Sequence, residues 1–249
     1  MQHLLSLAGA GLLAGAMNAV AGGGSFVTFP ALVVAGLPPV VANASSTVAL
    51  FPGTIASTWA YRRELASVGE IRLRLMLPVT VLGGFCGAVL LLVTPAHLFD
   101  LVIPWLLLLA TLTFAFGARV GTALRRVVRI GPATLMVVQF VISLYGGYFG
   151  GAVGLMMLAA WGLLTASVNV KAMGPARTLL VSAANGAAVL LFIASCVVRW
   201  PETLALLVGA VAGGYGGARV ARRLPAVLVR AVVVLLTATI TVMFFRRAM

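Results

Sequence analysis

Long apolar segments, separated by short polar or basic stretches, run through the whole chain of 249 residues. Ten such segments can be marked, at residues 4–20, 25–36, 40–61, 72–93, 98–118, 131–147, 152–165, 171–198, 203–218 and 225–245. A helix needs about 20 apolar residues to cross the hydrocarbon core of a bilayer. Most segments reach or approach that length, which predicts membrane-spanning helices. The segments 25–36 and 152–165 are too short to cross alone, so we expect half-helices or re-entrant arms there.

Each short segment follows a glycine-rich interruption of the apolar sequence. The first interruption contains Gly22, Gly23, Gly24 and Ser25, and the second runs over residues 146–154. Glycine in a helix interior costs about 1 kcal/mol relative to alanine. Backbone that leaves a helix inside a membrane must find protein or water as its hydrogen-bond partner, and broken helices of this kind are typical of substrate sites in transporters. The paired interruptions therefore favour transport.

Composition agrees with an integral membrane protein. Hydrophobic residues make up 62% of the chain and charged residues only 8%, whereas soluble domains carry about 25% charged residues. The net charge of +13 comes from basic residues that cluster between the apolar segments rather than on one soluble face. Such clusters are signals of membrane topology. The expected partner is thus the lipid bilayer, and nucleic acid is excluded.

The basic clusters also predict an orientation. Arginines lie in three connections that we place in the cytoplasm: residues 62–74, 119–129 and 219–230. The connection 94–100 has no Lys or Arg and residues 199–202 have one, so both are expected outside. Arg246 and Arg247 do not fit this orientation, because alternation of the segments across the membrane places the C-terminus outside. The N-terminus lacks a basic region before its apolar stretch, so we expect a retained membrane segment rather than a cleaved signal peptide.

The two halves of the chain resemble each other. A shift of 130 residues places the segment 83–88 on 213–218 and Thr47 on Arg177, and a shift of 126 places Gly24 on Gly150. Each half has five segments, an odd number, so the second half enters the membrane from the opposite side. We therefore expect an all-α integral membrane protein with an inverted-topology repeat and glycine-broken half-helices in each half. Its parts are a first repeat at 1–120, a basic cytoplasmic linker at 121–130 and a second repeat at 131–249.

Catalytic chemistry has little support in the sequence. The four acids fall at or near the ends of apolar segments, so no paired carboxylates for acid–base work lie within a predicted span. Cys86 and Cys196 lie in separate apolar segments, which favours packing over a disulfide or a metal site. We expect no enzyme, no metal and no cofactor. An intramembrane enzyme and a non-transporting scaffold remain as alternative classes.

Arg177 is the strongest candidate for contact with a ligand. In a helix that starts at Lys171 it would lie about 9 Å beyond that residue. A buried, unpaired arginine costs at least about 2.5 kcal/mol, and no acid is available along this stretch. A bound anion would resolve that cost, and snorkelling or bonding to backbone carbonyls is the alternative.

The N-termini of the half-helices would also suit an anion, because they carry partial positive charge and free N–H groups. Small polar side chains near the breaks complete the predicted site, although each alone could equally bond its own helix. The predicted substrate-binding residues are Gly22, Gly23, Gly24, Ser25, Asn43, Ser46, Thr47, Gly150, Gly151, Arg177 and Asn185. For Gly209, Gly213 and Gly217, spaced by four residues, we expect helix packing instead, because nothing polar accompanies them.

These motifs, in this order, resemble those of the TauE/SafE family of membrane permeases. The similarity rests on residues 21–24, 30–38, 42–53, 146–150 and 213–225, and it covers nearly the whole chain. It implies a multi-pass protein of the bacterial inner membrane that exports sulfite, sulfoacetate or another small organosulfur or carboxylate anion. The Asn-Lys pair often found in that family's first repeat is Ser46-Thr47 here, so the site is expected to be asymmetric and the particular anion is open. A homodimer is left open as well.

Overall fold

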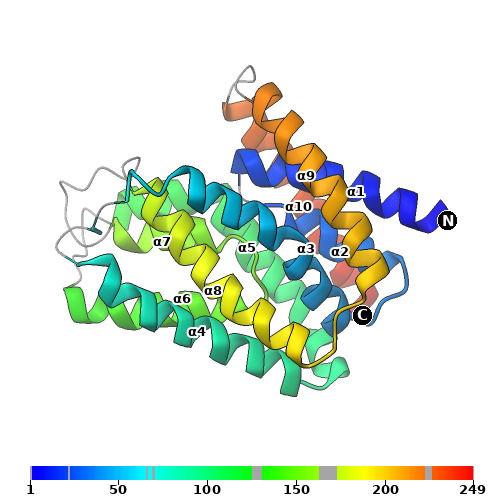
Figure 1. The fold of residues 1–249 in the computed structure, drawn as a ribbon, viewed down its shortest axis with the longest axis horizontal. Helices are drawn as coiled ribbons and strands as arrows, with labels where there is room; N and C mark the ends of the chain where they lie inside the picture. The colour runs from blue at the N-terminus through cyan, green and yellow to red at the C-terminus, as the bar shows by residue number, and fades with distance from the viewer. Residues whose placement is uncertain are drawn as a thin grey trace.

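The chain folds into a bundle of helices. In a computed structural model, residues 2–248 are described apart from residues 22 and 66 and the ranges 69–70, 125–130, 163–172 and 222–225. The described residues form ten helices and no strand, with a single backbone bridge between Val68 and Ile71 (Figure 1). The helices are α1 (Gln2–Ala21), α2 (Ser25–Val34), α3 (Pro39–Ala60), α4 (Leu73–Val93), α5 (Ala96–Leu124), α6 (Pro132–Tyr148), α7 (Val153–Trp161), α8 (Gly174–Ala194), α9 (Trp200–Ala221) and α10 (Ala226–Ala248).

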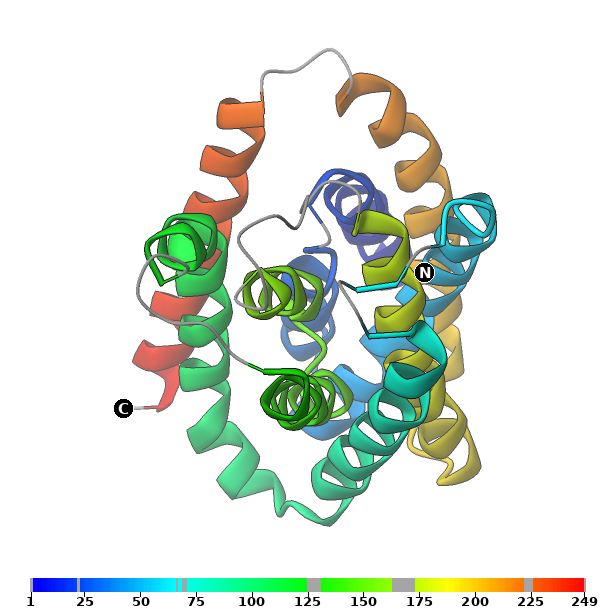
Figure 2. The same ribbon diagram turned by 90° about the vertical axis from the view of Figure 1, so that its left-hand side faces the viewer.

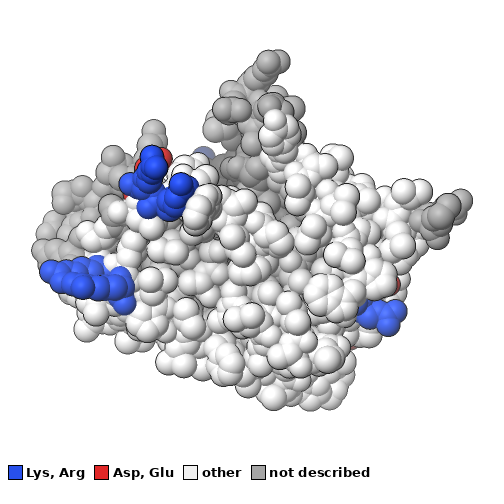
Figure 3. All heavy atoms as spheres, viewed as in Figure 1, with Lys and Arg blue, Asp and Glu red and all other residues white. Residues whose placement is uncertain are grey.

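The ten helices correspond to the ten apolar segments that the sequence predicts. Within the described residues, four stretches are long and apolar enough to cross a membrane: α3, α4, residues Ala96–Gly117 of α5, and α8. The exposed arginines Arg62, Arg63 and Arg72 lie in the connection between α3 and α4, and exposed Arg74 follows in the first turn of α4. This connection is at the left-hand end of Figure 1. On the face drawn in Figure 3, Lys and Arg gather at the ends of the molecule and the wide middle carries no charge. That middle can face lipid.

The two short helices are held inside the bundle. With ten and nine residues, α2 and α7 are each about 15 Å long or less, half the thickness of a hydrocarbon core. Helix α2 packs against α1, α3 and α10, and α7 packs against α5, α6 and α8. Viewed along the bundle, both lie near its centre with longer helices around them (Figure 2). The expected half-helices are therefore present.

Glycines allow two pairs of helices to pack in direct backbone contact. Helix α1 lies along α9, and α4 lies along α6. A Cβ atom on Gly213 would overlap the carbonyl oxygen of Leu12, and one on Gly87 would overlap that of Leu144. Gly209 is packed in the same way against Ala8. Helix packing is thus confirmed for Gly209 and Gly213, and the surroundings of Gly217 lie outside the described side chains.

Both glycine-packed pairs are parallel. Gly11 and Gly15 of α1 meet Leu206 and Ala210 of α9 in the same order along both helices. Likewise, Gly83 and Gly87 of α4 meet residues 140 and 144 of α6. Helix α1 is first in its half of the chain as α6 is in the other, and α4 is fourth as α9 is. The two pairs are therefore equivalent in the two halves.

Two further pairs, α3 with α8 and α5 with α10, are antiparallel. Thr58 Oγ1 donates to the carbonyl oxygen of Thr178 at 3.3 Å, whereas Phe51, two turns earlier, approaches Gly186, two turns later. Between α5 and α10, the hydroxyl oxygens of Thr111 and Thr241 are 3.2 Å apart. The rings of Trp105 and Phe245 meet on the same pair of helices at 5.3 Å between centroids, again in opposite order. Helices at corresponding positions in the two halves of the chain therefore pack antiparallel.

A buried polar network fixes the far end of α7. Gln139 of α6 donates through Nε2 to Thr80 of α4 at 2.9 Å, and its Oε1 accepts from Trp161 Nε1 at 3.0 Å. All three side chains are fully buried. Buried polar groups that satisfy each other in this way hold a unique arrangement, so the C-terminus of α7 is tied to α4 and α6.

Candidate functional site

The first glycine break is filled by apolar packing. Helix α1 ends at Ala21 and α2 begins at Ser25, while Gly22 lies outside the described residues. A Cβ atom on Gly23 would lie 3.2 Å from the ring of Phe114, and one on Gly24 would lie 2.9 Å from the carbonyl oxygen of Ala14. The glycines here allow a close approach of α1, α2 and α5. The roles of Gly23, Gly24 and Ser25 in binding remain predictions.

One polar contact joins the first half-helix to α3. The hydroxyl oxygens of Thr28 and Ser46 lie 2.5 Å apart, and both side chains are buried. Thr28 Oγ1 also lies 3.3 Å from the carbonyl oxygen of Gly24, to which it can donate. Ser46 therefore forms a hydrogen bond with α2 in this conformation.

The second break has a different backbone. Helix α6 ends at Tyr148 and α7 begins at Val153. Gly150 and Ala152 have φ angles of +80° and +61°, in the left-handed region that suits glycine and costs an alanine energy. These residues turn the chain sharply, so that α7 starts beside α8 rather than continuing α6.

The N-terminus of α7 presents free N–H groups. Leu155 and Met156 both donate to the carbonyl oxygen of Ala152. The N–H groups of Val153 and Gly154 donate no hydrogen bond to another described residue. A helix N-terminus carries partial positive charge and binds anions through such N–H groups.

Polar residues of α3 line the second break. Asn43 is buried and its Nδ2 donates to the carbonyl oxygen of Tyr148 at 2.8 Å. Thr47 Oγ1 lies 3.9 Å from the position of a Cβ atom on Gly150. The first break approaches the second here, because Phe26 of α2 lies 3.4 Å from the equivalent position on Gly151. The structure thus brings Asn43, Thr47, Gly150 and Gly151 together.

Arg177 lies against the start of α7. Its Cδ and Nε are 3.1 Å and 3.6 Å from the position that a Cβ atom on Gly154 would take. Its side chain is partly buried. Among the described residues it has no acidic partner. A permanent positive charge therefore stands beside the free N–H groups of α7.

The depth that the sequence suggested for Arg177 needs correction. Helix α8 begins at Gly174, with Pro175 in its first turn, rather than at residue 171. Proline is favoured in the first helical turn and disfavours a helical conformation in the residue before it. Arg177 therefore belongs to the first turn of α8, near the C-terminal end of α3, and Lys171 lies outside the described residues.

Asn185 lies two turns further along α8 from Arg177. Its Oδ1 is buried and has no hydrogen-bond partner among the described residues. No described contact joins it to Arg177 or to the second break. The cluster around that break consequently contains Asn43, Thr47 and Arg177 but not Asn185.

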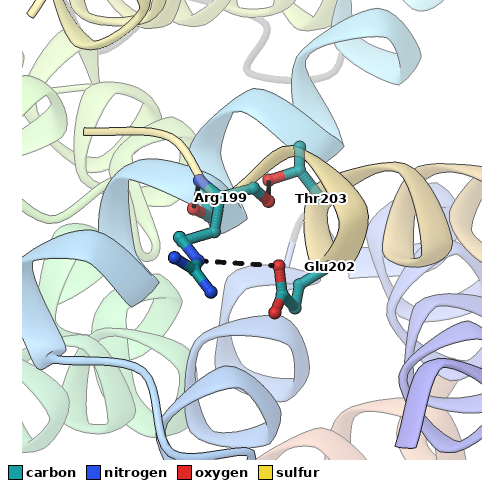
Figure 4. Close-up of polar contacts among 4 residues, drawn as sticks. Arg199, Glu202 and Thr203 are labelled. Carbon is teal, nitrogen blue, oxygen red and sulfur yellow. Dashed lines mark hydrogen bonds and ion pairs between the residues drawn. The ribbon is translucent and has the colours of Figure 1, made fainter. Parts of the chain in front are cut away.

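A buried acid is the functional candidate that sequence reasoning missed. Glu202, in the first turn of α9, is 8% exposed, although its position suggested an outer loop. Its Oε2 lies 3.9 Å from Nε of Arg199, whose backbone N–H donates to Ser45 Oγ at 3.0 Å (Figure 4). The sequence signal was Pro201 followed by Glu, a pattern typical of a helix start rather than a loop.

Among the described residues, no group of three His, Cys, Asp or Glu could hold a metal ion.

Comparisons with known proteins assign the chain to a family. Residues 7–244 match the model of the family described as sulfite exporter TauE/SafE. The chain is 29% identical over 231 residues to the "probable membrane transporter protein YfcA" of Escherichia coli strain K12, covering 92% of this chain and 85% of that protein. It is 27% identical over 252 residues to the "probable membrane transporter protein ORF9" of a Sinorhizobium species, covering 96% of this chain and 92% of that protein.

A third relative, a "probable membrane transporter protein" of Haemophilus influenzae, is 26% identical over 232 residues, with 93% of this chain and 90% of that protein covered. No solved structure matches the chain. The family match spans nearly the entire chain, and the relatives are named as transporters rather than enzymes. The chain therefore belongs to the sulfite exporter TauE/SafE family and is a multi-pass membrane transporter.

Proposed function

We propose that the protein exports a small anion, such as sulfite, sulfoacetate or another organosulfur or carboxylate anion, across the bacterial inner membrane. The observation that carries this proposal is the pairing of Arg177 with the free N–H groups at the start of α7. The family description names sulfite, and that anion fits a site of this kind. The proposal also accounts for a charged side chain without an acidic partner in an apolar protein.

The chemistry of the site matches an oxyanion. A guanidinium group can donate two parallel hydrogen bonds to two oxygens of one anion. The N–H groups of Val153 and Gly154 can donate to a further oxygen. Thr47 lies nearby on α3, but its hydroxyl donates to the carbonyl oxygen of Asn43 at 2.9 Å and would have to leave that bond to donate to the anion. Because Thr47 is the repeat equivalent of Arg177, only one half of the protein provides the charge.

We also infer that the two halves form an inverted repeat. A two-fold axis in the membrane plane requires corresponding helices to meet antiparallel, as α3 and α8 and also α5 and α10 do. A repeat axis along the membrane normal would make them parallel instead. Thr111 and Thr241, which are 130 residues apart, contact each other, as expected of equivalent residues beside such an axis.

The orientation follows from the arginines. The connection between α3 and α4 carries three of them, and Arg74 follows in the first turn of α4. This connection therefore belongs on the cytoplasmic side under the positive-inside rule. Arg177, near the inner end of α3, then meets anions that arrive from the cytoplasm. An inside-negative potential drives one negative charge outward by about 2.3 kcal/mol per 100 mV. A homodimer stays a prediction, which the mass of the purified protein in detergent would check.

The experiment is anion efflux from proteoliposomes. Vesicles loaded with ³⁵S-sulfite, sulfoacetate, methanesulfonate or acetate are compared for wild type, Arg177→Lys, Arg177→Ala and the exposed control Arg74→Ala. We expect wild type and Arg74→Ala to release at least one sulfur anion, Arg177→Lys to release it more slowly, and Arg177→Ala to lose most of the flux. Wild-type vesicles that retain every anion would contradict export of these substrates.

A further inference from the structure

A buried oxygen atom in the middle of α8 has no hydrogen-bond donor. It is Oδ1 of Asn185, which is shielded from solvent and accepts no hydrogen bond from any described residue. Ser182, one turn earlier on α8, is paired with Thr54 of α3 instead, with 3.5 Å between the hydroxyl oxygens. Leaving a buried acceptor unpaired costs free energy, so such an atom calls for an explanation. The carboxamide oxygen is available to a donor from outside the described residues.

Asn185 belongs to the interior side of α8. Its spacing from Ala188 and Phe192, three and seven residues later, places the three residues on one face of the helix. Ala188 and Phe192 are fully buried. The residue before Asn185 packs against α4, and the residue after it packs against α3. Asn185 is therefore on the side of α8 that faces the bundle rather than lipid.

Arg177 lies two turns earlier on the same side of the helix. Residues 177, 181 and 185 are spaced by four and form one ridge of side chains, with about 12 Å of helix axis between the first and the last. Helix α7 packs against α8 and meets Arg177 at Gly154. In the proposed orientation α8 runs outward from the cytoplasmic side. An anion that leaves Arg177 along this ridge therefore meets Asn185 next.

An unpaired acceptor restricts what can bind beside it. A carboxamide oxygen suits a hydrogen-bond donor or a cation, and it gains nothing from an oxyanion that offers only acceptors. A metal cation is disfavoured, because neither α3 nor α8 contains an acid and Arg177 places a positive charge on the same side of α8. An anion that carries its own O–H group suits both residues, since its oxygens accept from Arg177 and its O–H group donates to Asn185.

We propose that Asn185 is a second contact of the transported anion and selects sulfur oxyanions that carry a hydrogen-bond donor, such as hydrogen sulfite or a hydroxyalkanesulfonate. Oδ1 of Asn185 accepts the hydrogen bond of the substrate's O–H group. An anion without such a group leaves this oxygen unpaired, and a site that pairs a substrate hydroxyl discriminates against the analogue that lacks it. This inference rests on the proposed anion export and narrows its substrate class.

The test is a competition between two sulfonates that differ by one hydroxyl group. Proteoliposomes are loaded with equal concentrations of 2-hydroxyethanesulfonate and ethanesulfonate, and mass spectrometry measures the initial release of both from the same vesicles. We expect wild type to release the hydroxylated anion about five-fold faster, which corresponds to one neutral hydrogen bond. Asn185→Leu removes the acceptor and should abolish this preference. Ser182→Ala is the matched control, because it removes a polar group that already has a partner, and it should keep the wild-type ratio.

Folding of each variant is checked by its size-exclusion profile, and Asn185→Ala removes the same oxygen if leucine prevents folding. Three results would overturn the inference while leaving anion export intact. They are equal release of the two sulfonates by wild type, a preference that persists in a folded Asn185 variant, and release of sulfite but not of 2-hydroxyethanesulfonate by wild type. A Na⁺ requirement of wild-type efflux that Asn185→Leu abolishes would assign the oxygen to a cation and overturn it as well. Retention of every anion by wild type would instead remove the proposed export.

Discussion

A single methyl group at residue 154 should weaken anion binding without weakening the fold. In Gly154→Ala the new Cβ would lie 3.1 Å from Cδ and 3.4 Å from Cγ of Arg177. Ordinary carbon contacts are about 3.5–4.0 Å, so the arginine side chain must move by a few tenths of an ångström. Because the obstacle is a flexible side chain rather than backbone, α7 itself can stay in place.

The expected size of the effect follows from the contact that is disturbed. A hydrogen bond to a charged group is worth about 1.5–3 kcal/mol. If displacement of the guanidinium loses about 1 kcal/mol of that, the dissociation constant of the anion rises roughly five-fold. In contrast, alanine is favoured over glycine within a helix by up to about 1 kcal/mol. Thermal stability should consequently be equal to wild type or slightly higher.

The assay is calorimetric titration of purified protein with the sulfur anion that shows the fastest efflux, together with a thermal unfolding curve in the same detergent. Gly53→Ala is the matched control, since it lies within α3 and a Cβ there meets nothing within 4 Å. It should leave the dissociation constant unchanged. If folded Gly154→Ala binds the anion as tightly as wild type, Arg177 does not contact the anion from its position beside α7.

Three other outcomes are expected. Asn43→Ala should lower the free energy of unfolding by about 1–3 kcal/mol, because the buried carbonyl of Tyr148 loses its donor; unchanged chemical unfolding would contradict this. In a chain without Cys86 and Cys196, cysteines replacing Thr111 and Thr241 should cross-link on oxidation, whereas a pair at Thr113 and Thr241 should not. Cysteines at residues 64 and 227 should react with reagents from the inside and one at 97 from the outside; accessibility of 97 and 227 from the same side would end the inverted-repeat interpretation.

The pattern of apolar residues was enough to predict the elements of the fold. The breaks at residues 22–24 and 149–152 were visible because glycine runs are costly inside an apolar helix. Packing of Gly209 and Gly213 was predictable from their four-residue spacing and confirmed by their contact with α1. The start of α8 was misplaced because the apolar run continues to residue 171, although Gly174-Pro175 marks the helix start.

The site was less predictable because it depends on contacts between distant segments. The second break, rather than the first, lies beside a cation, because Gly154 contacts Arg177 of another helix. Both breaks look alike in sequence, but Phe114 and Ala14 pack against the first, whereas Gly150 and Ala152 turn the chain at the second. Burial of Glu202 likewise depends on α9 lying beside α1 and α3, which no local pattern reveals.

The central claim is that the anion binds at the second break, between Arg177 and the N-terminus of α7. Selenite has the shape and charge of sulfite and contains a strong anomalous scatterer, so crystals of the protein soaked in selenite would locate the anion directly. The account predicts an anomalous peak within hydrogen-bond reach of the Arg177 guanidinium and the N–H groups of Val153 and Gly154. A peak at Gly23 and Gly24, or one that persists in crystals of Arg177→Ala, would contradict it.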